Sequence, residues 1–165
     1  MEIFGLPAHV LIVHGAVVFI PLAVAAAIAF AVFPKWRYLT RWPALLLALV
    51  AAGNAWAARI TGKSFFDDAF DAYPEAIRNA IQDHESRGEV LSLVVLAFLL
   101  LVIFGFTMLG GASGFASGRG AKEMNAQWAE LVVPASIVVV GIVTLVYVVL
   151  TGDAGSRVVW DPPTS

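Results

Sequence analysis

The stretch that decides the fold is HVLIVHGAVVFIPLAVAAAIAFAVF, which runs from His9 to Phe33. It contains no aspartate, glutamate, lysine or arginine, and it exceeds the roughly 20 residues that an α-helix needs to cross the hydrocarbon core of a bilayer. The residues before it contain Glu2 and no basic side chain, whereas a secretory signal peptide begins with a basic region. We therefore expect a retained span that crosses the membrane as a helix.

The rest of the chain repeats this pattern. Of its 165 residues, 60% are hydrophobic and 13% are charged, and the charged share is about half that of a soluble domain. Three more stretches are long and apolar enough to cross a bilayer, at residues 43–60, 90–109 and 128–150. Together with residues 9–33 they predict an all-α membrane protein, a single domain over residues 1–165 built as a bundle of four transmembrane helices.

The composition also excludes several classes of function. The net charge of −2 provides no basic field that would attract nucleic acid. The absence of cysteine excludes thiolate catalysis and metal sites built on cysteine. The sequence contains no recognisable nucleophile set and no phosphate-binding loop, so we expect no catalytic residues, no metal ion and a protein that is not an enzyme.

The charges between the spans predict which side of the membrane each connection occupies. The connection at residues 34–42 contains Lys35, Arg37 and Arg41, whereas the connection at residues 61–89 contains three basic residues against seven acids. Short loops rich in lysine and arginine usually stay in the cytoplasm. We therefore expect a plasma-membrane protein whose two termini lie on the outer side, together with residues 61–89.

The segment 64–84, between the second and third spans, is expected to form a short amphipathic helix at the outer surface. Phe65, Phe66, Phe70 and Tyr73 share one helical face, and aspartates occupy the opposite face. Such an apolar face either packs on the bundle or docks a partner subunit. The sequence leaves both alternatives open.

Three histidines and their polar neighbours form the candidate site. His14 lies at about the same depth as Asn54 and Tyr147, and polar side chains inside a bilayer usually face the bundle interior. We therefore expect a structural polar cluster in which His14 bonds Asn54 or Tyr147, completed by charged residues at the rim: Arg59, Arg87 and Asp153. The alternative is a haem site whose ligands come from the three histidines: His9, His14 and His84.

The N-terminal GLPAHVLIVHGAVVFIPLA, residues 5–23, resembles the start of the DUF2231 family of small polytopic bacterial membrane proteins. The family pattern is a Gly-Leu-Pro-x-His stretch, a second histidine five residues on and a later Pro-Leu, and its positions are filled here by Gly5, Leu6, Pro7, His9, His14, Pro21 and Leu22. HESRGE around His84 is similar to the family's histidine before its third helix. TGDAGSRVVW, residues 151–160, is similar to its closing Thr-Gly-His motif, with Asp153 at the histidine position.

This resemblance implies a bacterial membrane protein and, since some relatives are joined to Rieske-type iron–sulfur domains, a respiratory setting. The function we expect is a non-catalytic accessory subunit of a larger membrane complex of the respiratory-chain type. Its partners would be the lipid bilayer and other membrane subunits, and it would bind no cofactor. The alternative is a small electron carrier that binds b-type haem or quinone, although Asp153 removes one candidate haem ligand.

Overall fold

Residues 2–3, 5–69, 72–109 and 128–162 are described by the structure, a computed structural model. Almost all of it lies in four long α-helices: α1 (Ala8–Val32), α2 (Arg37–Ala69), α3 (Glu75–Met108) and α4 (Ala129–Trp160). A 3-10 turn, η1 (Pro34–Trp36), joins α1 to α2, and the two-residue strands β1 (Glu2–Ile3) and β2 (Leu6–Pro7) pair ahead of α1. The all-α fold predicted from the sequence is confirmed.

Pro7, Pro34 and Pro74 lie at helix boundaries, whereas Pro21, Pro43 and Pro134 lie inside α1, α2 and α4. Pro7 and Pro74 stand directly before α1 and α3, where a missing backbone N–H costs nothing. Phe33 precedes Pro34, and the residue before a proline is disfavoured in the α conformation, so α1 ends at Val32. Gly5 turns the chain between β1 and β2 with a φ of 77°, a conformation that glycine adopts without strain.

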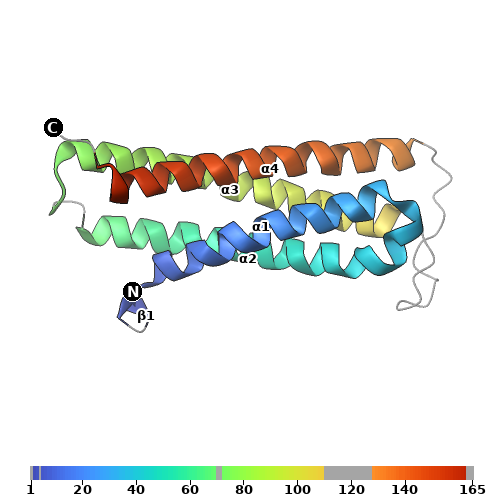
Figure 1. Cartoon of the computed structure of the whole chain (residues 1–165), viewed down its shortest axis with the longest axis horizontal. Helices are drawn as coiled ribbons and strands as arrows, with labels where there is room; N and C mark the ends of the chain where they lie inside the picture. Colours follow the sequence, from blue (N-terminus) through green and yellow to red (C-terminus); the bar gives the residue numbers. More distant parts are fainter. Residues whose placement is uncertain (1, 4, 70–71, 110–127, 163–165) are drawn as a thin grey trace.

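The four helices form an up-and-down bundle (Figure 1). Helix α1 packs beside α2 and α4, and α3 packs beside the same two helices, so that α1 and α3 lie across the diagonal. All four helices are long and apolar enough to cross a membrane, which indicates a multi-pass membrane protein. We name the two ends of the bundle by their residues: the histidine end, where α1 and α3 begin, holds His9 and His84, and the arginine end, where they finish, holds Arg37 and Arg41.

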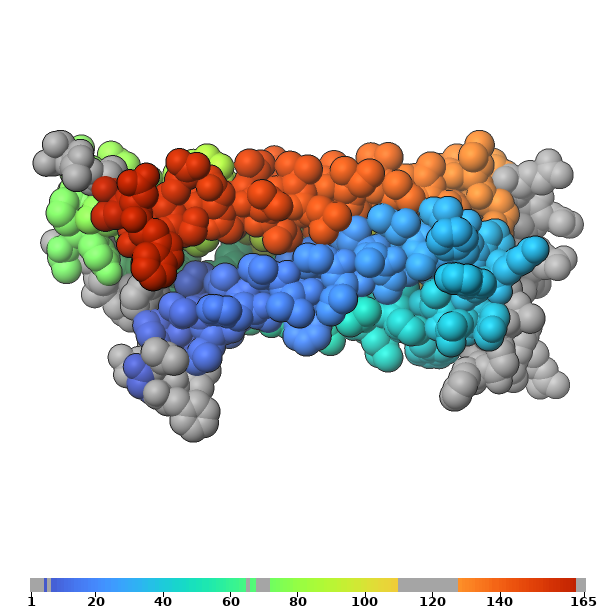
Figure 2. All heavy atoms as spheres, in the orientation of Figure 1, coloured from blue at the N-terminus to red at the C-terminus, as the bar shows by residue number. Residues whose placement is uncertain are grey.

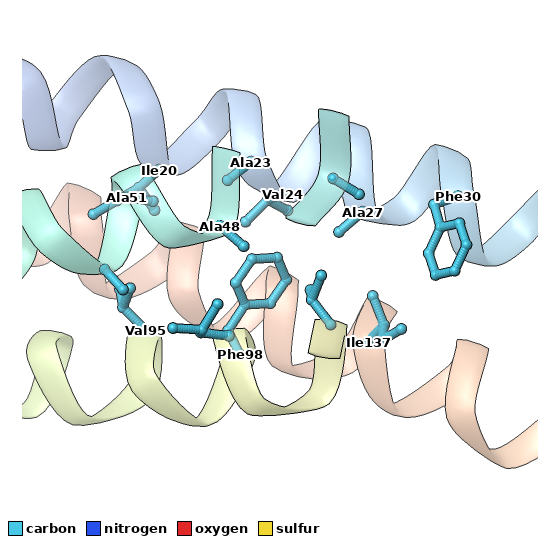
Figure 3. Close-up of a cluster of buried hydrophobic side chains, with 14 of the residues drawn as sticks. Ile20, Ala23, Val24, Ala27, Phe30, Ala48, Ala51, Val95, Phe98 and Ile137 are labelled. Atoms are coloured by element: carbon cyan, nitrogen blue, oxygen red, sulfur yellow. The ribbon is translucent and has the colours of Figure 1, made fainter. Parts of the chain in front are cut away.

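Small side chains bring α1 and α2 close together. Ala23 and Ala27 on α1 face Ala48 and Ala51 on α2, and all four are fully buried (Figure 3). Alanine allows two helix backbones to approach closely, which is how helices in a bilayer gain packing energy. The larger side chains of the core come mainly from the opposite pair of helices, as Phe98 does. By contrast, Gly53 on α2 is exposed on the outer face of the bundle.

The arginine end is closed by two buried side chains from the start of α2. Arg37 donates to Phe30 O and Ala31 O, which are carbonyls at the end of α1 that no further helical turn can satisfy. Arg41 donates to Phe106 O at 2.6 Å near the end of α3, and its guanidinium lies 4.1 Å from the centre of the Phe106 ring. Arg37 and Arg41, two of the three basic residues used to predict membrane orientation, are therefore also structural.

The separate amphipathic helix expected at residues 64–84 is not confirmed. Residues 64–69 continue α2, and residues 75–84 are the first turns of α3, so both transmembrane helices extend past the predicted spans. The physical reason is that leaving the apolar core does not end a helix. Between Ile60 and Ala69 there is no proline, and helical hydrogen bonds continue until a residue breaks them.

Candidate functional site

The histidine end contains a cavity of about 750 Å³ between the two helix pairs. Figure 2 shows that α1 and α4 part from each other at this end. All four helices contribute to its walls, and most of the lining side chains are apolar. Its lining includes His9, Val13, His14, Arg59, Lys63, Phe66, Tyr73, Ile77, Ile81, His84, Gly152, Gly155, Val158 and Val159. A volume of this size is typical of a site for a small molecule.

The His9 side chain on α1 forms a contact with the backbone of α2 at the cavity. Its Nδ1 lies 2.9 Å from Ala58 O on α2. The imidazole rests on Gly62, one helical turn further along α2, where a Cβ would lie 2.8 Å from the ring carbon Cε1. Glycine at this position therefore leaves room for the ring to reach the carbonyl.

His84 repeats this arrangement in the other half of the bundle. Its Nδ1 lies 3.0 Å from Thr151 O on α4. The ring rests on Gly155, again one turn further along, and a Cβ there would lie 2.8 Å from Cε1. The two imidazole centres are 6.1 Å apart and their planes are inclined by 75°. The structure thus brings His9, near the start of α1, close to His84, near the start of α3, although the whole of α2 lies between them in the sequence.

The contacts of the two rings fix which nitrogen is free. A backbone carbonyl can only accept a hydrogen bond, so Nδ1 of each neutral ring must carry the proton and donate it. The remaining nitrogen, Nε2, then has an available lone pair. Since both side chains line the same cavity, the cavity wall offers two basic imidazole nitrogens from opposite helix pairs.

Other polar groups lie around the cavity. Arg59 donates to Glu89 Oε1 at 2.5 Å and reaches Ser92 Oγ at 3.5 Å, and this links α2 to α3. Among the residues that the structure describes, the buried Thr151 hydroxyl has no hydrogen-bond partner. An unpartnered buried hydroxyl costs about 1–3 kcal/mol, and this one belongs to the residue that precedes Gly152 of the cavity lining.

The described hydrogen bonds of His14 and Asn54 lie within their own helices and do not include the expected contact of His14 with Asn54 or Tyr147. His14 Nδ1 bonds Val10 O of its own helix at 2.6 Å, and the side chain is exposed at the mouth of the cavity. Asn54 Nδ2 likewise donates to Val50 O in its own helix at 2.9 Å. Each side chain satisfies its polar group on the carbonyl four residues earlier, so neither needs the other. The Asn54 side-chain oxygen instead packs against Gly15, where any side chain would overlap it.

The other members of the expected polar cluster lie in separate contacts. Arg87 pairs with Asp83 within α3 at 2.9 Å, and Asp153 pairs with Arg157 within α4 at 2.9 Å. Tyr147 is half-buried and packs against the apolar core. The polar side chains predicted as one cluster therefore form several local pairs instead.

Of the four aromatic residues predicted to form an apolar face, two are described with their side chains. Phe66 is buried, Tyr73 is half-buried, and both line the cavity, so this part of the face packs on the bundle. The side chain of Phe65 and the whole of Phe70 lie outside the described residues.

Sequence reasoning missed the residues that support the histidines. Gly62 and Gly155 carried a usable signal, because a glycine inside a helix often marks the close approach of another group. In the described part of the chain, no three histidine, aspartate or glutamate side chains gather as a metal-ion site. Comparisons with family models, curated proteins and solved structures find no match for this chain. The resemblance to the DUF2231 family therefore stays a prediction.

Proposed function

We propose that the protein is a non-catalytic integral membrane protein that holds an apolar small molecule in the cavity at its histidine end. The observation that carries the proposal is the 750 Å³ cavity itself, which all four helices line with mostly apolar side chains. Along the rest of the core, buried side chains fill the space between the helices. At the histidine end α1 and α4 diverge instead. Open space of this size in an otherwise packed bundle is expected where a ligand is bound.

The position of the cavity supports a ligand that dissolves in the membrane. His14 and Val10 on α1 and Val159 on α4 are exposed and line the cavity, where α1 and α4 part. These exposed side chains form a lateral opening between α1 and α4 through which a lipophilic molecule could enter the cavity. The polar groups in the lining include three imidazoles, Arg59, Lys63, Glu85 and Ser156, and they would orient a polar head while the apolar side chains hold the rest.

Two glycines allow a matched test of this function. Gly152 lines the cavity and Gly53 lies on the outer face of α2, and an added Cβ at either position meets nothing within 4 Å. The protein is purified in detergent and any bound lipophilic molecule is identified by native mass spectrometry. Gly152→Phe should fill the cavity and release that molecule, whereas Gly53→Phe should retain it. Equal retention by both variants would contradict the proposal.

The accessory-subunit hypothesis is compatible with this function and remains a proposal of its own. Helix α4 supports it, because α4 is the least buried of the four helices and presents a long row of exposed apolar residues: Leu131, Val132, Val139, Ile142, Val146 and Val149. We propose that the protein lies in a bacterial plasma membrane, with this row facing lipid or another membrane subunit. Native gel electrophoresis after mild solubilisation should show a complex heavier than this chain if a subunit is bound.

A further inference from the structure

The paired histidines indicate what kind of molecule the cavity holds. Resting on the proposed function, we propose that the ligand is haem, bound between His9 and His84 as its two axial ligands.

The separation of the two rings matches a metal held from both sides. Metal–nitrogen bonds of about 2.0–2.1 Å, with each ring centre about 1 Å behind its nitrogen, place two opposed imidazole centres roughly 6 Å apart. The observed separation of the His9 and His84 ring centres is 6.1 Å. The two side chains come from α1 and α3, which lie diagonally across the bundle, so a group between them would lie inside it.

The hydrogen bonds of both rings are those of metal ligands. A histidine that binds a metal usually donates its other N–H to a carbonyl or carboxylate, which fixes the tautomer and the ring orientation. His9 does this with Ala58 O and His84 with Thr151 O. The His9 ring packs against Gly62 and the His84 ring packs against Gly155.

The number of ligands favours a porphyrin over a bare ion. A zinc ion is usually four-coordinate, and in the described part of the chain no third histidine, aspartate or glutamate completes such a site. Haem supplies four nitrogens itself and needs only two more ligands from the protein. The apolar wall suits its macrocycle, and Arg59 and Lys63 in the same wall could pair with its two carboxylates.

The test is titration of the purified full-length protein with hemin in detergent, followed by absorption and electron paramagnetic resonance spectra. Wild type should bind one equivalent and show the low-spin spectrum of a six-coordinate bis-imidazole complex. His9→Ala and His84→Ala should each lose that spectrum and weaken binding by more than about tenfold, the effect of disturbing even an outer partner of a ligand. Gln82→Ala is the control, because Gln82 is exposed on α3 and does not line the cavity, and it should behave as wild type.

A second pair of variants separates ligand loss from misfolding. His9→Gly and His84→Gly leave space for free imidazole, and adding imidazole should restore the low-spin spectrum if the fold is intact. Wild type without a low-spin complex, or alanine variants that keep it, would overturn the haem assignment. If haem does not bind but another lipophilic molecule is retained by wild type and lost in Gly152→Phe, the proposed function stands and only the haem assignment fails. Loss of the spectrum in His14→Ala but not in His9→Ala would overturn the assignment of His9 as a ligand and identify His14 in its place.

Discussion

Arg37 forms a two-pronged ion pair with Glu130, with Nη1 3.1 Å from Oε1 and Nη2 2.8 Å from Oε2. The arginine lies at the start of α2 and the glutamate in the first turn of α4. Because Arg37 also donates to two carbonyls at the end of α1, one side chain joins three helices. The pair is uneven in exposure, since the Arg37 side chain is 4% exposed and that of Glu130 is 50% exposed.

We expect Arg37→Met to destabilise the bundle by about 1–3 kcal/mol, the usual cost of leaving buried polar groups without partners. Glu130 can turn to water, so its lost charge partner should add little. Arg37→Lys should recover only part of the loss, because an ammonium cannot reproduce the planar fork. Unfolding free energies in detergent measure the effect. Lys35→Met, at an exposed site two residues earlier, is the control and should change stability little.

The glycines beneath the histidine rings make a second prediction. A Cβ at Gly62 or Gly155 would lie 2.8 Å from a ring carbon, so alanine must push the ring away from its carbonyl. Gly62→Ala and Gly155→Ala should each destabilise the protein by about 1–3 kcal/mol, the usual cost of overpacking. Thermal melts in detergent should show this loss.

The matched controls for this prediction are Gly152→Ala and Gly53→Ala, where a Cβ meets nothing within 4 Å. Because alanine is the better helix former by about 1 kcal/mol, these variants should be neutral or slightly more stable. A similar loss of stability in all four variants would show that the space beneath the rings is not what matters.

A third prediction concerns the close contact of α1 and α2. Ala27 is completely buried where these helices meet, whereas Ala25, two residues earlier, is exposed. Ala27→Leu should force the helices apart and cost about 1–3 kcal/mol of unfolding free energy. Ala25→Leu adds the same side chain on the outer face and should cost little. If both variants unfold at the wild-type temperature, α1 and α2 do not pack as described.

The sequence was sufficient to predict the four helices, because long uncharged runs have few alternatives to a membrane-spanning helix. It was less informative about where each helix ends, since hydropathy marks the bilayer and not the last hydrogen-bonded turn. That is why α2 continues to Ala69, past the expected limit at Ile60. This extension has a consequence for the site, because it carries Gly62 to a position opposite His9.

The candidate site was predicted only in part. The sequence shows how deep a residue lies along a transmembrane helix, but it does not show which neighbouring helix its side chain points toward. His14 and Asn54 were matched in depth, yet each bonds its own helix. His9 and His84 were both named as haem ligands in the alternative hypothesis, but their pairing depends on how four helices pack. Thr151 and Ala58 contribute only backbone carbonyls, which leave no signal in side-chain chemistry.

The orientation of the bundle in the membrane gives a fourth prediction. Lys35 lies exposed at the arginine end and Gln82 lies exposed near the histidine end. The native chain has no cysteine, so Lys35→Cys and Gln82→Cys each introduce a single reactive thiol. In intact cells a charged maleimide that cannot cross the membrane should label position 82 and spare position 35, because the basic connection is expected inside. Both positions should react once the membrane is dissolved in detergent, which confirms that each thiol is accessible. The reverse pattern in intact cells would place the histidine end in the cytoplasm, and labelling of both positions before solubilisation would mean that the two ends do not lie on opposite sides of a sealed bilayer.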